Sequence, residues 1–149
     1  MMLTYKRHSN FSKWLKQLLK KFRTLEEDIK TVQRSAIELL LLRSLDNRSI
    51  DLIPTFNSDT VRIYKIRKFS CKSLKWKWVQ SGIRIIFAYF PERQEVEYLE
   101  IYYKADQENM DYDFAKEYFK NINTCESIEV DTKTQRKMDS IGNLWKNKQ

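Results

Sequence analysis

Cysteine, glycine, proline and histidine are all scarce in this 149-residue chain. The two cysteines, Cys71 and Cys125, are far apart in the sequence, and His8 is the one histidine. Such a set builds neither a disulfide framework nor a His/Cys metal site. We therefore expect reduced thiols, no bound metal and no cofactor.

A long hydrophobic run is also missing. The most apolar segment, 36–42, is far shorter than a membrane span and contains Glu38, and the N-terminus lacks the apolar core of a signal peptide. These absences predict a cytoplasmic protein that does not associate with membranes. The length suits one domain, and a hydrophobic content of 42% is enough for a compact core.

Acidic residues are absent from two long segments, 1–25 and 60–91, and the formal net charge is +8. Such a charge attracts nucleic acid, an anionic membrane or an acidic protein, and charge alone does not choose among them. Two solvated basic faces are the plain alternative. The second segment contains three candidates for RNA binding, which are Arg67, Lys68 and Lys72.

Helical spacing dominates the first third of the chain. Apolar residues from Phe11 to Phe22 recur every three or four positions and predict a helix whose opposite face is rich in lysine. Thr24 and Glu27 have the spacing of a capping box, which predicts a second helix that runs to Leu42 or Arg43. We expect the two helices to form a hairpin with an apolar inner seam.

Strand-forming residues dominate the middle of the chain. Segment 46–59 has the composition of a loop, and β-branched and aromatic residues then concentrate in four segments separated by turn-like breaks. We expect three or four antiparallel strands that pair in chain order. The four segments are 61–69, 74–80, 83–90 and 95–103.

The end of the chain contains one more periodic segment. Asp111 or Asp113 is expected to cap a short helix, and the sequence beyond Asn123 is polar with little periodicity. The fold class is therefore predicted as α+β, with an N-terminal helical hairpin packed on a twisted antiparallel sheet of three to four strands. The predicted organisation is one domain over 1–122 and a polar tail over 123–149 that is loosely ordered or partly helical.

Basic residues alternate with large apolar residues between Ser73 and Arg84. In a strand, Lys75 and Lys77 would share one face, and the Ser-Gly turn at 81–82 would bring Arg84 beside them. Ammonium and guanidinium groups together suit a phosphodiester. These three cations are therefore the leading candidates for a catalytic site, although such a cluster would also bind RNA without cleaving it.

Cleavage of RNA without a metal requires proton transfer as well as charge. The RNA 2′-hydroxyl must lose a proton, the phosphoryl oxygens must be stabilised, and the departing 5′-oxygen must gain a proton. Arg84 suits the second task because its charge is constant near neutral pH. Crowding and partial burial would lower the pKa of Lys75 or Lys77 and favour a role as base, and either lysine would otherwise stabilise charge alone.

Tyrosines near the end of the last strand add a further candidate. Tyr112 precedes the final helix, and a tyrosine can transfer a proton or stack on an unpaired base. Tyr102 and Tyr103 are more typical of strand packing. The acidic residues between Asp106 and Asp113 are interpreted as a solvated loop with capping roles, because their spacing matches no metal loop.

The element order and four short motifs resemble the RelE/ParE superfamily of bacterial type II toxins. The motifs are Arg67-Lys68-Phe69, Lys72-Ser73-Leu74, Ser81-Gly82-Ile83-Arg84 and Leu99-Glu100-Ile101-Tyr102. The resemblance implies a small basic toxin that is neutralised by a cognate antitoxin. In the RelE-like branch, it implies a ribosome-dependent endoribonuclease that cuts mRNA without a metal.

The resemblance also implies roles for individual residues. The two alternating lysines of the RelE-like branch correspond to Lys75 and Lys77, and its arginine after the Ser-Gly turn corresponds to Arg84. Its later arginine and tyrosine correspond to Lys104 and Tyr112, with lysine in place of arginine. The alternatives are a ParE-like protein that poisons DNA gyrase by binding, and a decayed toxin that only binds RNA or antitoxin.

Overall fold

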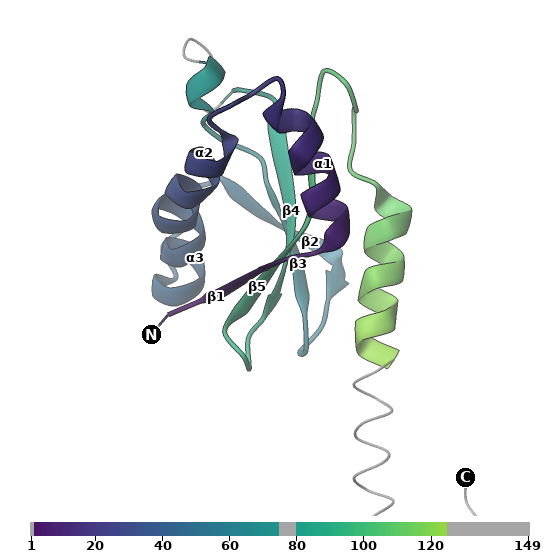
Figure 1. Ribbon diagram of the computed structural model, residues 1–149. Coiled ribbons are helices and arrows are strands. Elements are labelled where there is room, and N and C mark those ends of the chain that lie inside the picture. The colour runs from purple at the N-terminus through teal and green to yellow at the C-terminus, as the bar shows by residue number, and fades with distance from the viewer. Residues whose placement is uncertain (1, 75–79, 125–149) are drawn as a thin grey trace, which may run out of the picture.

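The computed structural model describes residues 2–74 and 80–124, and it contains a five-stranded sheet with the strand order β1-β5-β4-β3-β2. β1 runs parallel to β5, and the other neighbouring strands are antiparallel, so the sheet is mixed. Figure 1 shows the arrangement. The strands are β1 (Thr4–Arg7), β2 (Ile50–Asn57), β3 (Arg62–Ile66), β4 (Ile83–Phe90) and β5 (Glu95–Tyr103).

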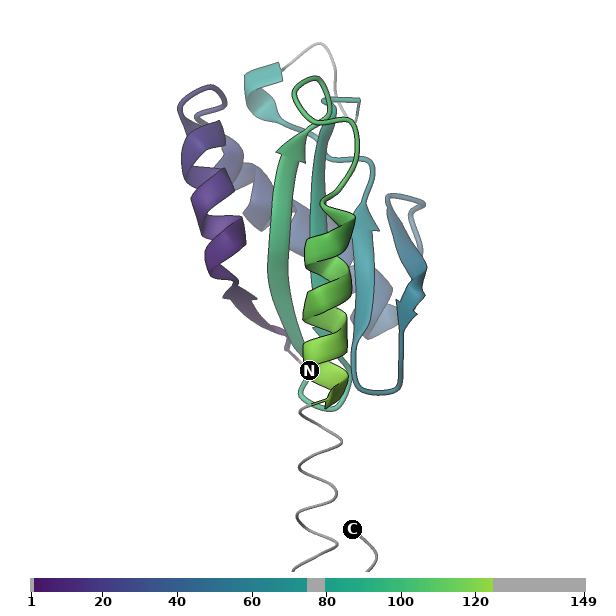
Figure 2. The same cartoon turned by 90° about the vertical axis from the view of Figure 1, so that its right-hand side faces the viewer.

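Helices cover both faces of the sheet (Figures 1 and 2). One face is covered by α1 (Ser9–Leu19), α2 (Leu25–Val32) and α3 (Glu38–Arg43), with a π-helical turn at Gln33–Ile37 between the last two. A helix over residues 112–124 packs on the other face. Among the described residues, no helix is long and apolar enough to cross a membrane.

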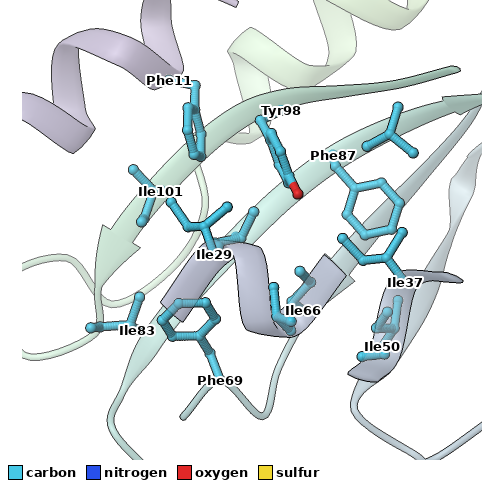
Figure 3. Close-up of a cluster of buried hydrophobic side chains, with 14 of the residues drawn as sticks. Phe11, Ile29, Ile37, Ile50, Ile66, Phe69, Ile83, Phe87, Tyr98 and Ile101 are labelled. Atoms are coloured by element: carbon cyan, nitrogen blue, oxygen red, sulfur yellow. The ribbon is translucent and has the colours of Figure 1, made fainter. Parts of the chain in front are cut away.

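Two hydrophobic clusters hold these layers together, one on each face of the sheet. The larger cluster joins α1 to α3 with alternate residues of the strands, including Phe11, Ile29, Phe87 and Tyr98 (Figure 3). The smaller cluster joins the other set of strand residues to the helix over 112–124, through Ala115. Strand side chains alternate between the two faces of a sheet. The residues of β3, β4 and β5 that belong to one cluster therefore show which of their neighbours point to the opposite face.

The predicted helical hairpin on a sheet of three to four antiparallel strands is wrong. α1 packs along β5 rather than on α2: the Phe11 ring stacks on the Tyr98 ring at 5.0 Å, and Asn10 Nδ2 donates to the Leu99 carbonyl at 3.1 Å. The apolar stripes of α1 and α2 therefore face the sheet instead of each other. The sheet also contains a parallel edge strand, β1, within segment 1–7, whose weak pattern is compatible with a short first strand.

The segment 46–59, which was predicted to be a loop, contains the edge strand β2. Its sequence includes Pro54, which lacks a backbone N–H and is tolerated on edge strands or at bulges. The pairing of β2 with β3 indeed shifts register between Leu52 and Asn57. Burial of Ile50 and Phe56 attaches this strand to both clusters despite its polar composition.

Most of the predicted strand over 74–80 lies outside the described residues, so this strand stays a prediction. Lys72–Leu74 form a 3-10 turn, and Gln80 makes an isolated bridge with Phe69, while 75–79 lie outside the described residues. The two antiparallel neighbours of β4 are β3 and β5, so segment 74–80 does not pair with β4 as expected. The pairing of β3 with β4 therefore joins two strands that are separated in the sequence by residues 67–82.

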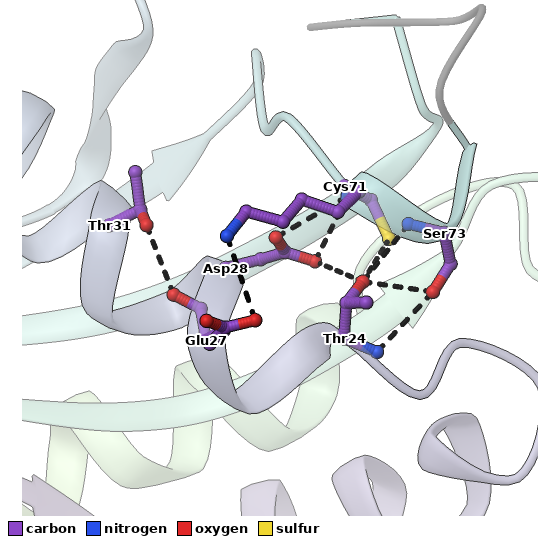
Figure 4. Close-up of polar contacts among 7 residues, drawn as sticks. Thr24, Glu27, Asp28, Thr31, Cys71 and Ser73 are labelled. Carbon is purple, nitrogen blue, oxygen red and sulfur yellow. Dashed lines mark hydrogen bonds and ion pairs between the residues drawn. The ribbon is translucent and has the colours of Figure 1, made fainter.

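The start of α2 is fixed by contacts that cross to the 3-10 turn. α2 begins after Thr24 as predicted, but Thr24 makes no capping hydrogen bond with its side chain. Its hydroxyl instead bonds Asp28 and Ser73, both at 2.8 Å, and the buried Asp28 carboxylate accepts from the Lys72 backbone N–H (Figure 4). The capping box is therefore wrong, and the polar residues are used to attach segment 71–73 to α2.

Two other predictions are confirmed. β4 and β5 occupy 83–90 and 95–103 as expected, and Asp111 Oδ1 accepts from the Phe114 N–H at the start of the last described helix. Ala115 is buried, and Tyr118 packs against the same cluster. Most of the predicted tail, from 125 to 149, lies outside the described residues, so its character stays a prediction.

Candidate anion-binding site

A group of cations lies on the sheet face that is covered by the helix over 112–124. Lys65 alternates along β3 with Tyr64 and Ile66, whose side chains belong to the larger cluster, so Lys65 faces the other way. Arg84 alternates along β4 with Ile83 and Ile85 in the same manner. Both cations therefore share a face, near the end of the sheet where β4 begins and β5 ends.

The turn before β4 fixes the position of Arg84. The Ser81 hydroxyl is buried, donates to the Phe69 carbonyl and accepts from the Ile83 N–H. Gly82 has a φ of 85°, a left-handed conformation that favours glycine, and its carbonyl accepts from the Lys104 N–H at 2.8 Å. These bonds attach the start of β4 to the end of β5 and bring Arg84 and Lys104 to the same edge.

Lys104 completes a cluster of three cations with Lys65 and Arg84. Burial lowers the pKa of Lys65, and the charges of Arg84 and then Lys104 lower it further. Within residues 2–74 and 80–124, none of these three cations forms an ion pair. The nearby carboxylate of Asp51 pairs with Arg67 instead. The cluster, which we call the cation cluster, therefore carries concentrated positive charge that suits an anion.

Two residues of β5 border the cation cluster. Tyr102 is the antiparallel partner of Arg84, and its hydroxyl is buried with no hydrogen-bond partner in the described part of the chain. Glu100 is buried, and its carboxylate accepts from Gln107 Nε2 at 2.7 Å and from the Asp111 N–H at 2.9 Å. Burial raises the pKa of Glu100, so a proton is held more readily there than on an exposed carboxylate.

The structure brings together only some of the predicted catalytic residues. Arg84 and Lys104 lie in the cation cluster, whereas Lys75 and Lys77 lie outside the described residues. Tyr112 stands in the first turn of the helix over 112–124, with its ring 5.0 Å from the ring of Phe56 on β2. It is 46% exposed, which leaves it accessible to a ligand.

The predicted RNA-binding residues are divided between the two sides of the sheet. Arg67 is near Lys65 and binds the Asp51 carboxylate. Lys72 Nζ lies 3.6 Å from the Glu27 carboxylate of α2, and Lys68 lines a cavity beside α2. Lys68 and Lys72 therefore sit on the side of α2, away from the cation cluster.

Sequence reasoning missed Lys65 and Glu100, and it ranked Tyr102 low. The available signal was the alternation of Lys65 with Tyr64 and Ile66, which places it opposite the core. This alternation could not place Lys65 near Arg84 as long as β4 was expected to pair with segment 74–80. Only the observed β3–β4 pairing places Lys65 beside Arg84.

Metal-ligating side chains do not gather in the described residues, where no group of three or more His, Cys, Asp or Glu could hold an ion. The arrangement at the cation cluster offers fixed positive charge, a lysine with a lowered pKa, and an unpartnered hydroxyl. These groups can bind a phosphate, stabilise negative charge on its oxygens and move a proton.

No family model matches this chain, and no curated protein does either. Among solved structures, it is similar to the archaeal RelE–RelB complex from Pyrococcus horikoshii OT3, with a TM-score of 0.41 and 13% identity. The match covers 68% of this chain and 93% of that chain. Overlap at this level assigns neither fold nor activity, so function must be argued from the residues of the cation cluster.

Proposed function

We propose that this protein is the toxin of a type II toxin–antitoxin system, and that it cleaves mRNA on the ribosome as an endoribonuclease. The observation that carries the proposal is the cation cluster, three cations that form no ion pair with the described residues and lie beside a buried hydroxyl. The sequence motifs that resemble the RelE-like branch, and the net charge of +8, support the same function.

The proposed reaction uses the 2′-hydroxyl of the RNA as the nucleophile. Its oxygen attacks the adjacent phosphorus, the bond from phosphorus to the 5′-oxygen breaks, and the products are a 2′,3′-cyclic phosphate and a 5′-hydroxyl. The atoms balance without water or a metal, because the proton that leaves the 2′-oxygen is matched by the proton that the 5′-oxygen gains.

Each cation has a task in this scheme. Arg84 holds the phosphoryl oxygens, since a guanidinium presents a planar pair of donors and keeps its charge. Lys65 accepts the proton of the 2′-hydroxyl, because its lowered pKa increases the neutral fraction of its amine. Lys104 adds positive charge. Tyr112, Lys75 and Lys77 remain predicted contributors, with Tyr112 as the proton donor to the 5′-oxygen.

The proposed partner is a small acidic antitoxin that covers the basic surface. A net charge of +8 and the acid-free helix α1 favour an anionic partner segment. The proposal predicts that a short reading frame beside this gene encodes a protein that binds the toxin and suppresses its activity.

A cleavage assay with full-length protein tests the proposal. Purified protein is incubated with a defined mRNA, with and without ribosomes. We expect cleavage only when ribosomes are present, and a loss of at least tenfold in the R84A and K104A variants. The matched control is K30A, which removes an exposed lysine from α2 on the other face of the sheet.

Three results would contradict the proposal. Full activity of R84A and K104A would separate the cation cluster from the reaction. Inhibition of gyrase supercoiling by the wild-type protein, without mRNA cleavage, would favour the ParE-like alternative. Expression without any growth penalty would indicate a decayed toxin that only binds its partners.

A further inference from the structure

A cavity of about 180 Å³ lies at the edge of β5, between α1 and the turn at 104–107. β1 pairs only with the first half of β5, as far as Tyr98, so no strand of the described residues pairs with the second half on that side. α1 covers this half instead and leaves the cavity. Such a volume is below the roughly 300–1,000 Å³ of drug-sized pockets, and it suits one planar ring system.

Aromatic rings and amide groups line this cavity together. Trp14 of α1 is 38% exposed, and Tyr102 and Tyr103 of β5 also line the cavity, with side chains that belong to opposite faces of the sheet. Gln17 and Gln107 supply polar groups. The two N–H groups of the Gln107 amide already donate, to Glu100 and to the Asn109 carbonyl, so its carbonyl oxygen is the atom left to accept.

Tyr102 is a neighbour of both the cavity and the cation cluster. This residue lines the cavity, pairs with Arg84 across the β4–β5 ladder and is only 4% exposed. Its hydroxyl is left without a partner in the described residues, and a buried unpartnered hydroxyl is costly unless a ligand or water bonds it. Lys21 also lines the cavity, with its Nζ 4.9 Å from the centre of the Tyr103 ring and 3.9 Å from the carboxylate of Asp106, another lining residue. The cation cluster therefore supplies the positive charge beside the cavity that has no carboxylate partner in the described residues.

We propose that this cavity is a nucleobase subsite, which holds one unpaired base of an RNA strand whose phosphate lies on Arg84 and Lys104. The inference rests on the proposed function and adds a residue-level account of how substrate is held. Single-stranded RNA is commonly recognised by bases that stack on aromatic side chains and bond polar groups at their edges. Trp14 supplies the stacking surface, and Gln17 and Gln107 supply the edge contacts.

A nucleobase fits these observations better than an aliphatic side chain of an acidic peptide. An aliphatic group would fill the cavity but could not bond the amides of Gln17 and Gln107, which line it. A base carries both donors and acceptors in one plane and can satisfy both groups. Its own phosphate then accounts for the cations of the cluster.

Mononucleotide binding by the full-length protein tests the subsite without any cleavage step. The four 5′-ribonucleoside monophosphates are compared with ribose 5-phosphate, which has the same phosphate and sugar but no base. Stacking of one base contributes about 1–3 kcal/mol, which corresponds to about 5–150-fold in affinity. We expect at least one mononucleotide to bind about tenfold or more tightly than ribose 5-phosphate.

Variants assign this preference to the cavity. W14A should remove the difference between mononucleotide and ribose 5-phosphate while leaving the affinity for ribose 5-phosphate unchanged. W14F should retain most of the difference, and R84A should weaken both ligands equally. The control K30A should change neither. In wild-type protein, nuclear magnetic resonance should show the side-chain amide signals of Gln17 and Gln107 shifting with mononucleotide only, which requires no mutation.

Equal affinities for mononucleotides and ribose 5-phosphate would overturn the subsite, as would unchanged amide signals. Binding of a glutamate- and leucine-rich peptide that depends on Trp14, without nucleotide binding, would make the cavity a protein-docking site and also overturn it. These outcomes can be distinguished from the outcomes that test the proposed function. Base preference without mRNA cleavage contradicts the enzyme and keeps the subsite, whereas cleavage without base preference contradicts only the subsite.

Discussion

Replacing Lys65 with methionine should stabilise the fold and remove activity at the same time. Lys65 is half-buried between β2 and β4, forms no ion pair with the described residues, and has Arg84 and Lys104 close to it. Methionine keeps an unbranched apolar stem of similar reach and deletes the charge. The variant therefore removes desolvation and like-charge repulsion while it keeps the packing.

The sign follows from the lowered pKa of Lys65. Its proton is held less tightly in the folded state than in the unfolded state, so the charged lysine lowers the free energy of unfolding at neutral pH. This destabilisation declines as the pH rises through the folded-state pKa toward the unfolded-state pKa. Relief of such a surface or near-surface charge is typically worth about 0.5–2 kcal/mol. In a chain of this size, each kcal/mol raises Tm by about 2–4 °C.

Thermal and urea unfolding at neutral pH measure this effect, with K65R and K30M as controls that keep the charge or remove it elsewhere. Activity should change in the opposite direction. Loss of a positioned general base slows such a reaction by about 10²- to 10⁴-fold, so kcat/KM should fall by about 100-fold or more. A K65M protein that is destabilised, or that cleaves RNA as fast as wild type, would refute this reasoning.

Three further changes probe the surroundings of the cation cluster. Burial raises the pKa of Glu100, so the free energy of unfolding should increase as the pH falls from neutral toward about 4.3, the ordinary pKa of glutamate. The E100Q variant should lose this increase when urea midpoints are compared across that range. Y102F deletes a buried hydroxyl that has no partner in the described residues, so the variant should unfold at an equal or higher urea concentration than wild type. In calorimetry it should bind mononucleotide more weakly. A clear loss of stability would show that the hydroxyl has a structural partner. G82A places an alanine at a φ of 85°, which should lower the free energy of unfolding in urea by about 1–2 kcal/mol. The variant should also cleave RNA more slowly, because Arg84 is displaced. Unchanged unfolding would show that alanine is not strained at this turn.

Local patterns were enough to predict several elements. The boundaries of β4 and β5 follow from dense β-branched and aromatic residues between turn signals, and Asp111 at the start of the last described helix follows from its capping chemistry. These signals report the burial and backbone preference of neighbouring residues. They required no knowledge of which segments meet in space.

Strand pairing could not be predicted in the same way. The short break between 80 and 83 favoured a hairpin of consecutive strands, yet β3 pairs with β4 across an intervening segment that is attached to α2 through Asp28. β1 adds to β5 in parallel, from the opposite end of the sequence. Both pairings depend on long-range burial, and no single segment specifies them.

Because strand pairing could not be predicted, the sequence predicted only part of the candidate site. Arg84 was found because its turn has a strong local signal, whereas Lys65 depends on the β3–β4 register and Glu100 depends on the return of the 104–111 loop over β5. Arg67, Lys68 and Lys72 are close in sequence, but the chain places them on different sides of the sheet. Proximity in sequence therefore overestimated the extent of one basic surface.

The chemistry of the RNA ends after cleavage tests the central claim most directly. Full-length protein is incubated with ribosomes and a labelled mRNA, and the products are examined for their terminal groups, in parallel with the R84A variant. The account predicts 2′,3′-cyclic phosphate and 5′-hydroxyl ends with wild type and none with R84A. Ends with a 5′-phosphate, or intact mRNA with both proteins, would contradict the claim that the cation cluster promotes attack by the RNA 2′-hydroxyl.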